Sequence, residues 1–577
     1  MTLPATISSI LIVLACAPFH HALSLPYNPD QTAGSSDGAI WPFGSGEGTL
    51  PWHSSGSHSS GSYWFEEWVS VLDTMQSTYW NGTYWPTTIQ WIGAFLDTLL
   101  AASDRSFTNV LVEYDGTIPG TSTSHEGIQS GISGYYNQIV GYYGNEDTIQ
   151  IFGAAYDDAQ WVVLEWLEAI KFINKYDMYA STALGQDDIA GFAHRAHIFY
   201  NIVAGQFNTT LCGGGLTWNP ALAVYKNSIT NELFISSSIG MYLYFPGDSN
   251  TDPYPNPDYT ETTNLTLPDL APLSAHDPSL LDNAIKEYSW FKSQPFRNAQ
   301  GLVIDGFHIS DGQTTCDQPS DMVYTYNQGV LLSGLRQLWE ATGDQSYLED
   351  AYAYIYSTIN ATGWYARTGD EAAQWHGLGR NGIMEDYCDA AANCSQDAQM
   401  FKGIYFHHLD LFCEPLPTRK PLINGITHVA SSSLAGSHAR KCQGYVPWVA
   451  HNARAALATR NSTSNIIGEW WGASYINQTQ APNPGYSQPN PGPDPWNHPR
   501  LLKQPPWVCE GKHECGKDRH HHNTGLRTRR VAHKLVEGIS NRQASSDSDD
   551  TRTVQTQGSG LSVVKAAADL MLKRPPG

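Results

Sequence analysis

The chain has 577 residues, of which 41% are hydrophobic and 12% aromatic, and this composition is typical of a globular protein with a large core. Its 32 basic and 55 acidic residues give a net charge of -23, which disfavours nucleic acid and anionic membranes as general partners. No stretch reaches the roughly 18 apolar residues that a membrane-spanning helix needs. We therefore expect a soluble protein without stable membrane insertion.

The first residues predict a secretory signal peptide over residues 1–24. Residues 7–17 are mostly apolar, and small residues at 22–24 offer a cleavage point, although no Lys or Arg precedes the apolar stretch. Seven glycosylation sequons point the same way, at Asn81, Asn208, Asn264, Asn360, Asn393, Asn461 and Asn477. We expect a secreted, extracellular glycoprotein.

Nine cysteines fit the same compartment, because eight of them lie beyond the signal and form an even set. An oxidising compartment makes disulfides the default state of such cysteines. Proximity in the chain favours pairing Cys388 with Cys394 and Cys413 with Cys442, although spacing alone does not fix connectivity.

Residues 25–62 are rich in Gly, Ser, Pro and His and predict a flexible lead-in. Apolar residues then recur at helical spacing while strand-like alternation is scarce, so the predicted class is all-α. Paired helices of this kind can close as a toroid, and bundles and open solenoids remain alternatives. Eleven helical segments are expected, with room for a weak twelfth: 63–75, 88–102, 128–143, 159–174, 188–204, 220–244, 278–291, 322–341, 346–358, 395–411 and 445–459.

Residues 461–577 predict a disordered tail, so the expected domain boundary lies at 460. Pro, Asn and Gly crowd residues 481–506, and residues 501–577 carry 13 basic and 8 acidic side chains. Cys509, His513 and Cys515 precede three more histidines, but their spacing does not match a regular zinc finger. We expect no metal site there and no cofactor elsewhere.

Adjacent carboxylates at Asp157 and Asp158 open a tryptophan-rich helical segment, where a helix start favours negative charge. One interpretation is a plain helix cap. The other is acid/base chemistry on a sugar, because Tyr156 and Trp161 offer stacking faces beside the pair. A second doublet, Asp187 and Asp188, also opens a helix and is interpreted as a cap that could line a groove.

Several motifs in a fixed order carry a more specific signal. Residues 155–161 read AYDDAQW, and they are followed by CGGGL at 212–216, Trp218, YKNSITNELF at 225–234, TYNQG at 325–329 and FKGI at 401–404. This set resembles glycoside hydrolase family 76, the α-1,6-mannanases and their fungal cell-wall relatives. The resemblance covers residues 63–458 and leaves out the lead-in and the tail.

The resemblance implies an (α/α)6 toroid and a retaining mechanism with Asp157 as nucleophile and Asp158 as general acid/base. Retaining enzymes hold their two carboxyl groups about 5 to 5.5 Å apart. We expect the groove to bind sugar through six residues, for which core packing or helix capping is the competing interpretation: Tyr156, Trp161, Trp218, Tyr326, Asn327 and Gln328. For the glycines at 213–215, close approach to a ligand and a turn braced by Cys212 are equally good interpretations.

The predicted function is therefore endo-acting hydrolysis of α-1,6-mannosidic linkages in mannan or cell-wall glycans, with a polysaccharide as the partner. One alternative keeps the same residues but transfers the mannose core of an anchor glycan to another glycan. A second alternative, from a different class, is a mannan-binding protein without catalysis.

Overall fold

The computed structural model describes residues 61–114, 118, 121, 123–180, 183–366, 374–392, 394–475 and 552–573. The signal peptide, nearly all of the lead-in and the segment around Cys509 lie outside the described residues. Among the described helices, none has both the length and the apolarity that crossing a membrane requires.

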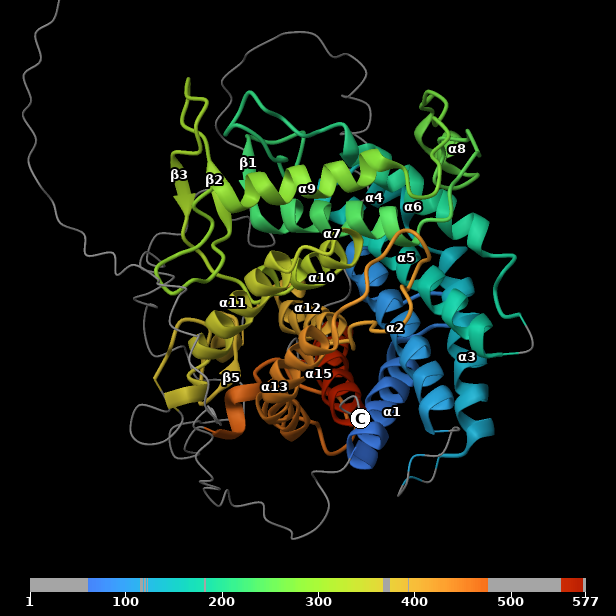
Figure 1. The fold of residues 1–577 in the computed structure, drawn as a ribbon, viewed down its shortest axis with the longest axis vertical. Coiled ribbons are helices and arrows are strands. Elements are labelled where there is room, and N and C mark those ends of the chain that lie inside the picture. Colours follow the sequence, from blue (N-terminus) through green and yellow to red (C-terminus); the bar gives the residue numbers. More distant parts are fainter. Residues whose placement is uncertain are drawn as a thin grey trace, which may run out of the picture. The chain divides into compact units, whose positions relative to one another are not determined.

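Six helices form an inner ring in which each packs against the next and the last packs against the first (Figure 1). In ring order they are α2 (Gln90–Tyr114), α5 (Tyr156–Tyr179), α7 (Ser228–Tyr244), α10 (Val330–Thr342), α12 (Gln396–Phe412) and α15 (Val554–Leu572).

Six more helices surround this ring, each packed against an inner helix. They are α1 (Gly61–Tyr79) and α13 (Ser432–Ala458) on α15, α3 (His125–Tyr143) on α2, α6 (Ile189–Ala204) on α5, α9 (Pro278–Ser293) on α7, and α11 (Ser346–Ala361) on α10. The double ring confirms the predicted all-α class and (α/α)6 toroid.

Short elements fill the connections between the rings. Strands β1 (Tyr225–Asn227), β2 (Gly306–His308) and β3 (Gln318–Ser320) form an antiparallel sheet in that order, and β4 (Gly379–Arg380) pairs with β5 (Ile383–Met384). The remaining turns are α4 (Thr148–Phe152), α8 (Tyr259–Thr263), η1 (Tyr326–Gln328), η2 (Trp364–Ala366), η3 (Asp389–Ala391) and η4 (Trp471–Tyr475).

Helix α15 corrects the predicted domain boundary at residue 460, because residues 554–572 belong to the inner ring and not to a tail. Figure 1 shows α15 in red between α1 and α13. Its small residues allow close packing against α12: a Cβ added to Gly403 would lie 2.5 Å from the Cα of Ser559.

The charges that made this segment look like a solvated tail are buried in the structure. Lys565 Nζ lies 3.0 Å from an oxygen of Asp410 on α12 and 2.7 Å from an oxygen of Asp569. Lys573 Nζ lies 2.7 Å from the other Asp410 oxygen. A prediction from composition assumes that charged residues face solvent, whereas these residues form ion pairs between inner helices.

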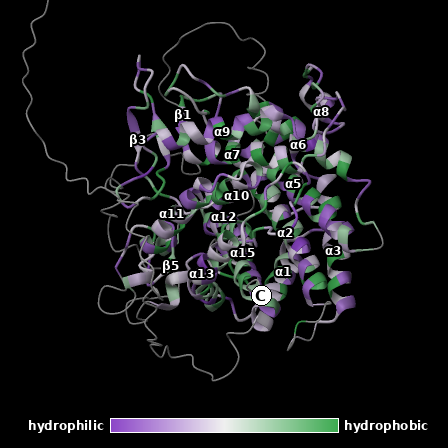
Figure 2. Ribbon diagram, in the orientation of Figure 1, coloured by the Kyte–Doolittle hydropathy of each residue, from purple (hydrophilic) through white to green (hydrophobic). Residues whose placement is uncertain are grey.

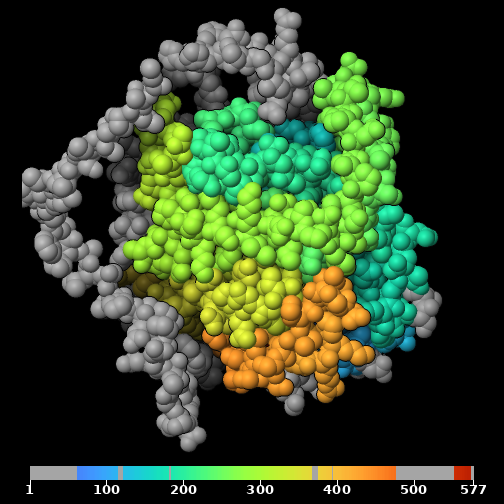
Figure 3. All heavy atoms as spheres, turned by 45° about the horizontal axis from the view of Figure 1, so that its top comes forward, coloured from blue at the N-terminus to red at the C-terminus, as the bar shows by residue number. Residues whose placement is uncertain are grey.

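The segment from residue 413 to 431 closes the end of the ring where α10 and α12 finish. His428 N–H donates to the Glu340 carbonyl at 2.8 Å, and Arg336 donates to the carbonyls of Phe412 and Pro415 at 3.0 and 3.1 Å. Figure 3 shows this segment in orange, packed against the yellow residues of α10 and α11. The opposite end, where the inner helices begin, is left for the site.

Within the described part of the chain, three disulfides brace the connections. The predicted pairs Cys388–Cys394 and Cys413–Cys442 are confirmed, and a third bond joins Cys212 to Cys316. Apolar residues concentrate where the helices face one another (Figure 2), and α7 has buried residues around its whole circumference. Helix α7 therefore lacks the one-sided pattern by which an amphipathic helix is recognised.

The tight contact between α12 and α15 predicts opposite effects for two glycine substitutions. Gly403→Ala should lower the free energy of unfolding by about 1–3 kcal/mol, because its methyl group meets the backbone of Ser559. Gly444→Ala on α13 has no neighbour within 4 Å and should raise that free energy by about 0.5–1 kcal/mol. Denaturant titration of both variants measures this; stabilisation by Gly403→Ala would contradict the placement of α15.

Candidate functional site

The aspartate doublet lies at the beginning of α5, on the end of the ring where the inner helices start. Helix α5 begins at Tyr156, and its N-cap residue, Ala155, supplies no side-chain hydrogen bond. Instead the Asp158 N–H donates to Asp157 Oδ1 at 3.2 Å, and the Tyr156 N–H donates to the Trp218 carbonyl at 2.7 Å. Asp157 therefore caps its own helix, so the capping and catalytic interpretations are compatible.

The two carboxyl groups differ in their affinity for a proton. Both side chains are half-buried, and desolvation is the main cause that raises each pKa. The pKa of Asp157 rises to about 7, held down by hydrogen bonds from the backbone N–H groups of Asp157 and Asp158. The pKa of Asp158 lies well above its usual range, because the charge of Asp157 adds to the desolvation. The pair therefore passes through a state in which one proton resides on Asp158.

Asp397 adds a third carboxyl group from the first turn of α12. Trp91 on α2 donates its indole N–H to Asp397 Oδ1 at 2.9 Å. The same indole stacks on Trp161 of α5, with ring centroids 5.4 Å apart and an angle of 24° between planes. Burial raises the pKa of Asp397, and its charge in turn raises the pKa values of Asp157 and Asp158. Trp91 thus holds Asp397 in place and connects α12 to α5.

Asp305 contributes a fourth carboxyl group from the connection that leads into β2. The Tyr225 hydroxyl donates to Asp305 Oδ2, and the Tyr225 ring stacks on His308 with centroids 4.0 Å apart. Burial raises the pKa of Asp305 to about 6, against the lowering effect of the Tyr225 hydrogen bond. Because its charge raises the pKa of Asp157, Asp305 belongs to the same acidic cluster.

Tyr326 brings an aromatic face to this cluster. It lies in η1, is partly exposed, and stacks on Phe401 of α12 with centroids 3.8 Å apart and planes 6° apart. The charges of Asp305 and Asp157 raise the pKa of its hydroxyl, after the larger effect of burial. Tyr326 therefore lies near the doublet, and its contact with sugar stays a prediction.

The other residues predicted to contact sugar differ in how much of their surface a ligand could reach. Gln328 is at odds with direct contact, because its amide bonds both the N–H and the carbonyl of Val303, at 2.8 and 2.9 Å. Trp161 is 3% exposed and Tyr156 5%, so each presents little surface. Asn327 is fully buried in η1, beside Tyr326. Trp218 is partly exposed and remains available to a ligand.

The second doublet lies elsewhere, at the start of the outer helix α6. Asp188 accepts a hydrogen bond from the Tyr136 hydroxyl on α3. It thus fastens two outer helices together. Because α6 begins after α5 has ended, Asp187 and Asp188 lie at the end of the ring opposite to Asp157 and Asp158, which disagrees with the expected groove lining.

A polar network fixes η1 to α12 behind the cluster. Asp386 accepts from the Thr325 N–H at 2.9 Å and from its hydroxyl at 2.6 Å, while Lys402 Nζ lies 2.5 Å from Asp389 Oδ1. Asp389, Cys394 and Glu469 come close enough together to resemble a metal site. These donors do not fit a metal, because the sulfur of Cys394 is bonded to Cys388 and Lys402 already supplies the positive charge.

Trp91, Tyr225, Asp305 and Asp397 were missed as site residues by sequence reasoning. Trp91 and Asp397 occupy the first turn of inner helices, and Tyr225 lies in the strand directly before α7. The sequence could have indicated these residues only through their position at the starts of inner helices. Once the inner helices of a toroid are identified, polar and aromatic residues at their starts are candidates for one shared site.

A closed double ring with an acidic cluster where the inner helices begin defines the class of (α/α)6 toroids with a site at one end. Residues 269–471 match the model of glycosyl hydrolase family 76. The match includes Asp305, Tyr326 and Asp397, whereas the doublet precedes it.

Two curated relatives are mannan endo-1,6-α-mannosidases by name. DCW1 of Candida glabrata is 24% identical over 45% of this chain and 47% of its own length. The putative enzyme C1198.07c of Schizosaccharomyces pombe is 23% identical over 46% and 52%. The chain therefore spans about half the length of the curated relatives it matches. Among solved structures, it is similar to an inactive variant of the α-1,6-mannanase GH76A of Salegentibacter sp. HEL1_6 in complex with α-1,6-mannotetrose, with 16% identity, a TM-score of 0.46, and coverage of 88% of this chain and 99% of that one.

Proposed function

We propose that the protein is a secreted or cell-wall glycoside hydrolase that cleaves α-1,6-mannosidic linkages within mannan or cell-wall glycans. The observation that carries this proposal is the pair of adjacent carboxyl groups with unequal proton affinities at the beginning of α5. The names of the curated relatives support the linkage.

In the first chemical step, Asp157 is the nucleophile and Asp158 the acid. The Asp157 carboxylate attacks the anomeric carbon of a mannose unit while the bond to the leaving oxygen breaks. Asp158 gives its proton to that oxygen, so the leaving sugar departs as a neutral alcohol. The product is a mannosyl ester on Asp157 and an ionised Asp158.

In the second step, Asp158 acts as the base. It takes a proton from water as the water oxygen attacks the anomeric carbon, and the Asp157 carboxylate leaves. Two inversions at one carbon give net retention of configuration. The enzyme returns to its initial protonation state, with the proton on Asp158.

The surroundings of the two aspartates support this division of roles. Asp157 has the lower pKa, about 7, and backbone N–H groups stabilise its charge, as a nucleophile requires. Asp158 has the higher pKa and so holds a proton when Asp157 is ionised. The Tyr326 and Trp218 side chains are the partly exposed aromatic faces that we assign to sugar stacking.

Replacing either aspartate with asparagine should abolish turnover. We expect Asp157→Asn and Asp158→Asn each to lower the release of reducing ends from linear α-1,6-mannan by at least about a hundredfold. Asp187→Asn, in the outer doublet, is the matched control and should retain activity. Full activity in both site variants would rule the mechanism out.

The same assay separates the two alternatives. Mannan binding without turnover by the wild-type protein would favour the noncatalytic binding protein. Products longer than the substrate, formed when an acceptor glycan is added, would favour transfer of the mannosyl group to a glycan in place of water.

Removing the charge of Asp397 should move the pH profile towards acid. Activity requires Asp157 ionised and Asp158 protonated, so it rises with pH through the Asp157 pKa and falls through the Asp158 pKa. Because the Asp397 charge raises both pKa values, Asp397→Asn should shift both limbs of the kcat/KM profile to lower pH. A profile that stays in place or moves to higher pH would contradict the electrostatic coupling; Asp187→Asn again serves as the control.

A further inference from the structure

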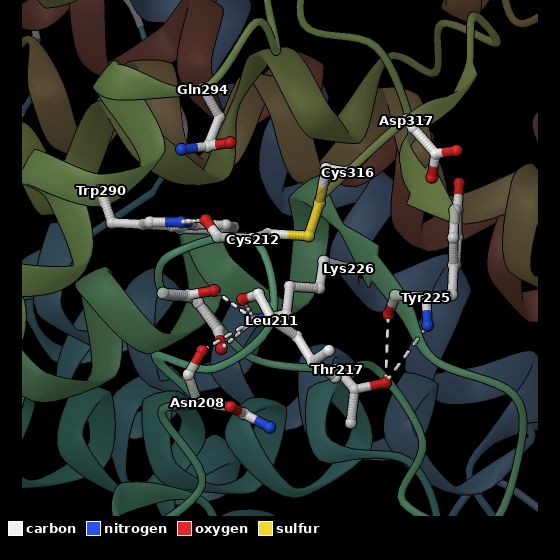
Figure 4. Close-up of a disulfide and its surroundings, with 12 residues drawn as sticks. Asn208, Leu211, Cys212, Thr217, Tyr225, Lys226, Trp290, Gln294, Cys316 and Asp317 are labelled. Atoms are coloured by element: carbon white, nitrogen blue, oxygen red, sulfur yellow. Dashed lines mark hydrogen bonds between the residues drawn. A yellow bond between two sulfur atoms is a disulfide. The ribbon is translucent and has the colours of Figure 1, made fainter. Parts of the chain in front are cut away.

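Lys226 is a buried cation held by backbone carbonyl groups. It lies in β1, is 1% exposed, and points its ammonium group into the loop formed by residues 208–215 (Figure 4). Its three N–H groups are shared among four carbonyl oxygens: those of Leu211 at 2.7 Å, Gly215 at 2.9 Å and Asn208 at 3.1 Å from Nζ, and that of Gly214. We call Lys226 and these four carbonyls the lysine cage.

The cage neutralises the ammonium group with dipoles in place of an ion pair. Among the described residues, no carboxylate comes within salt-bridge distance of Lys226 Nζ, and Glu287 acts on it only through space. Burial accordingly lowers the pKa of Lys226 to about 8. A buried charge is costly, so the loop conformation and the charge depend on each other.

The glycine-rich motif gives the loop its shape. Gly214 and Gly215 lie against the indole of Trp290, where an added Cβ would come within 2.4 and 2.2 Å of ring atoms. Gly213 and Gly215 have φ angles of +68° and +76°. The Trp290 N–H donates to the Cys212 carbonyl at 2.9 Å, and Cys212 is bonded to Cys316 (Figure 4). These glycines therefore turn carbonyl groups towards Lys226 and pack on an aromatic ring, which differs from the ligand approach considered from the sequence.

The same loop continues directly to the doublet. After Gly215, the chain is fixed where the Trp218 N–H donates to the Tyr225 carbonyl at 3.0 Å. The Trp218 carbonyl then accepts the Tyr156 N–H, at the first residue of α5, at 2.7 Å. Since Ala155 offers no side-chain cap, the loop supplies an acceptor at the very start of the helix that carries Asp157 and Asp158.

We propose that Lys226 is a positioning residue for the aspartate doublet: its ammonium group gathers the loop carbonyls, and the loop holds the first turn of α5 through Trp218. The expected effect of Lys226 on catalysis rests on the proposed function, whereas its expected effect on the first turn of α5 does not. Without the cation, four carbonyl oxygens would face one another across a gap, and their repulsion would open the loop. The Tyr156 N–H would then lose its acceptor.

The test removes the cation and then returns it as a small molecule. Lys226→Ala deletes the equivalent of n-propylammonium, which is added back to the variant, with n-propanol as the uncharged control. Lys226→Met fills the same space without a charge. Lys286→Ala is the matched control, because Lys286 is an exposed lysine nearby on α9 that contacts the ring of Phe207.

Two measurements are made on each variant: hydrogen exchange at the Tyr156 amide by mass spectrometry, and kcat and KM on α-1,6-mannan. We expect both Lys226 variants to exchange faster at Tyr156 and to lose about a hundredfold in kcat, because a small displacement of reacting groups has an effect of that size. For Lys226→Ala, n-propylammonium should restore both quantities with saturation, whereas n-propanol should not. Lys286→Ala should behave as wild type.

Unchanged exchange at Tyr156 in both Lys226 variants would overturn the proposal. So would a loss of folding that n-propylammonium does not reverse, because it would indicate a purely structural lysine. If wild-type protein shows no turnover, the proposed function fails, and the exchange measurement still decides whether Lys226 holds the first turn of α5.

Discussion

The structure depends on closure of the inner ring, and α15 provides it. This helix packs against α12 on one side and α2 on the other, so the five inner helices that precede it would otherwise leave an open arc. Asp397 approaches the doublet only because α12 is held beside α2, where Trp91 bonds its carboxylate. Closure and the acidic cluster are thus linked: a segment late in the sequence fixes the distance between groups that come from α2, α5 and α12.

Within the closed ring, burial and like charge give two identical side chains different proton affinities. Desolvation raises the pKa values of Asp157 and Asp158, backbone N–H groups favour the ionised form of Asp157, and its charge keeps the proton on Asp158. Asp397 and Asp305 add negative charge around the pair. The start of α5 also fixes where the doublet lies, because the first N–H of the helix donates to the Trp218 carbonyl. We propose that the lysine cage in turn holds the loop that carries Trp218.

Much of the fold could be predicted from the sequence, and the exceptions have physical causes. Outer helices such as α1 show one apolar face, which periodicity detects, and close cysteine pairs identified two disulfides. Helix α15 was not predicted because its charged Lys565 and Asp569 are buried, with Lys565 in ion pairs with both Asp410 and Asp569. Motifs singled out the doublet and Tyr326 as candidates, whereas Asp305 and Asp397 were not predicted, because their approach to the doublet depends on three-dimensional closure. For Gln328, the sequence did not reveal that its amide bonds the backbone of Val303, and the predicted sugar contact stays a prediction.

The central claim is that Asp157 forms a covalent bond to the sugar and Asp158 serves both steps. The most direct test is the anomeric configuration of the first product released from an α-1,6-linked mannan oligosaccharide, followed by proton NMR before mutarotation. We expect the new reducing end to appear first as the α anomer, because two successive inversions retain configuration. Initial appearance of the β anomer would mean a single displacement by water and would contradict the assignment of Asp157 as nucleophile.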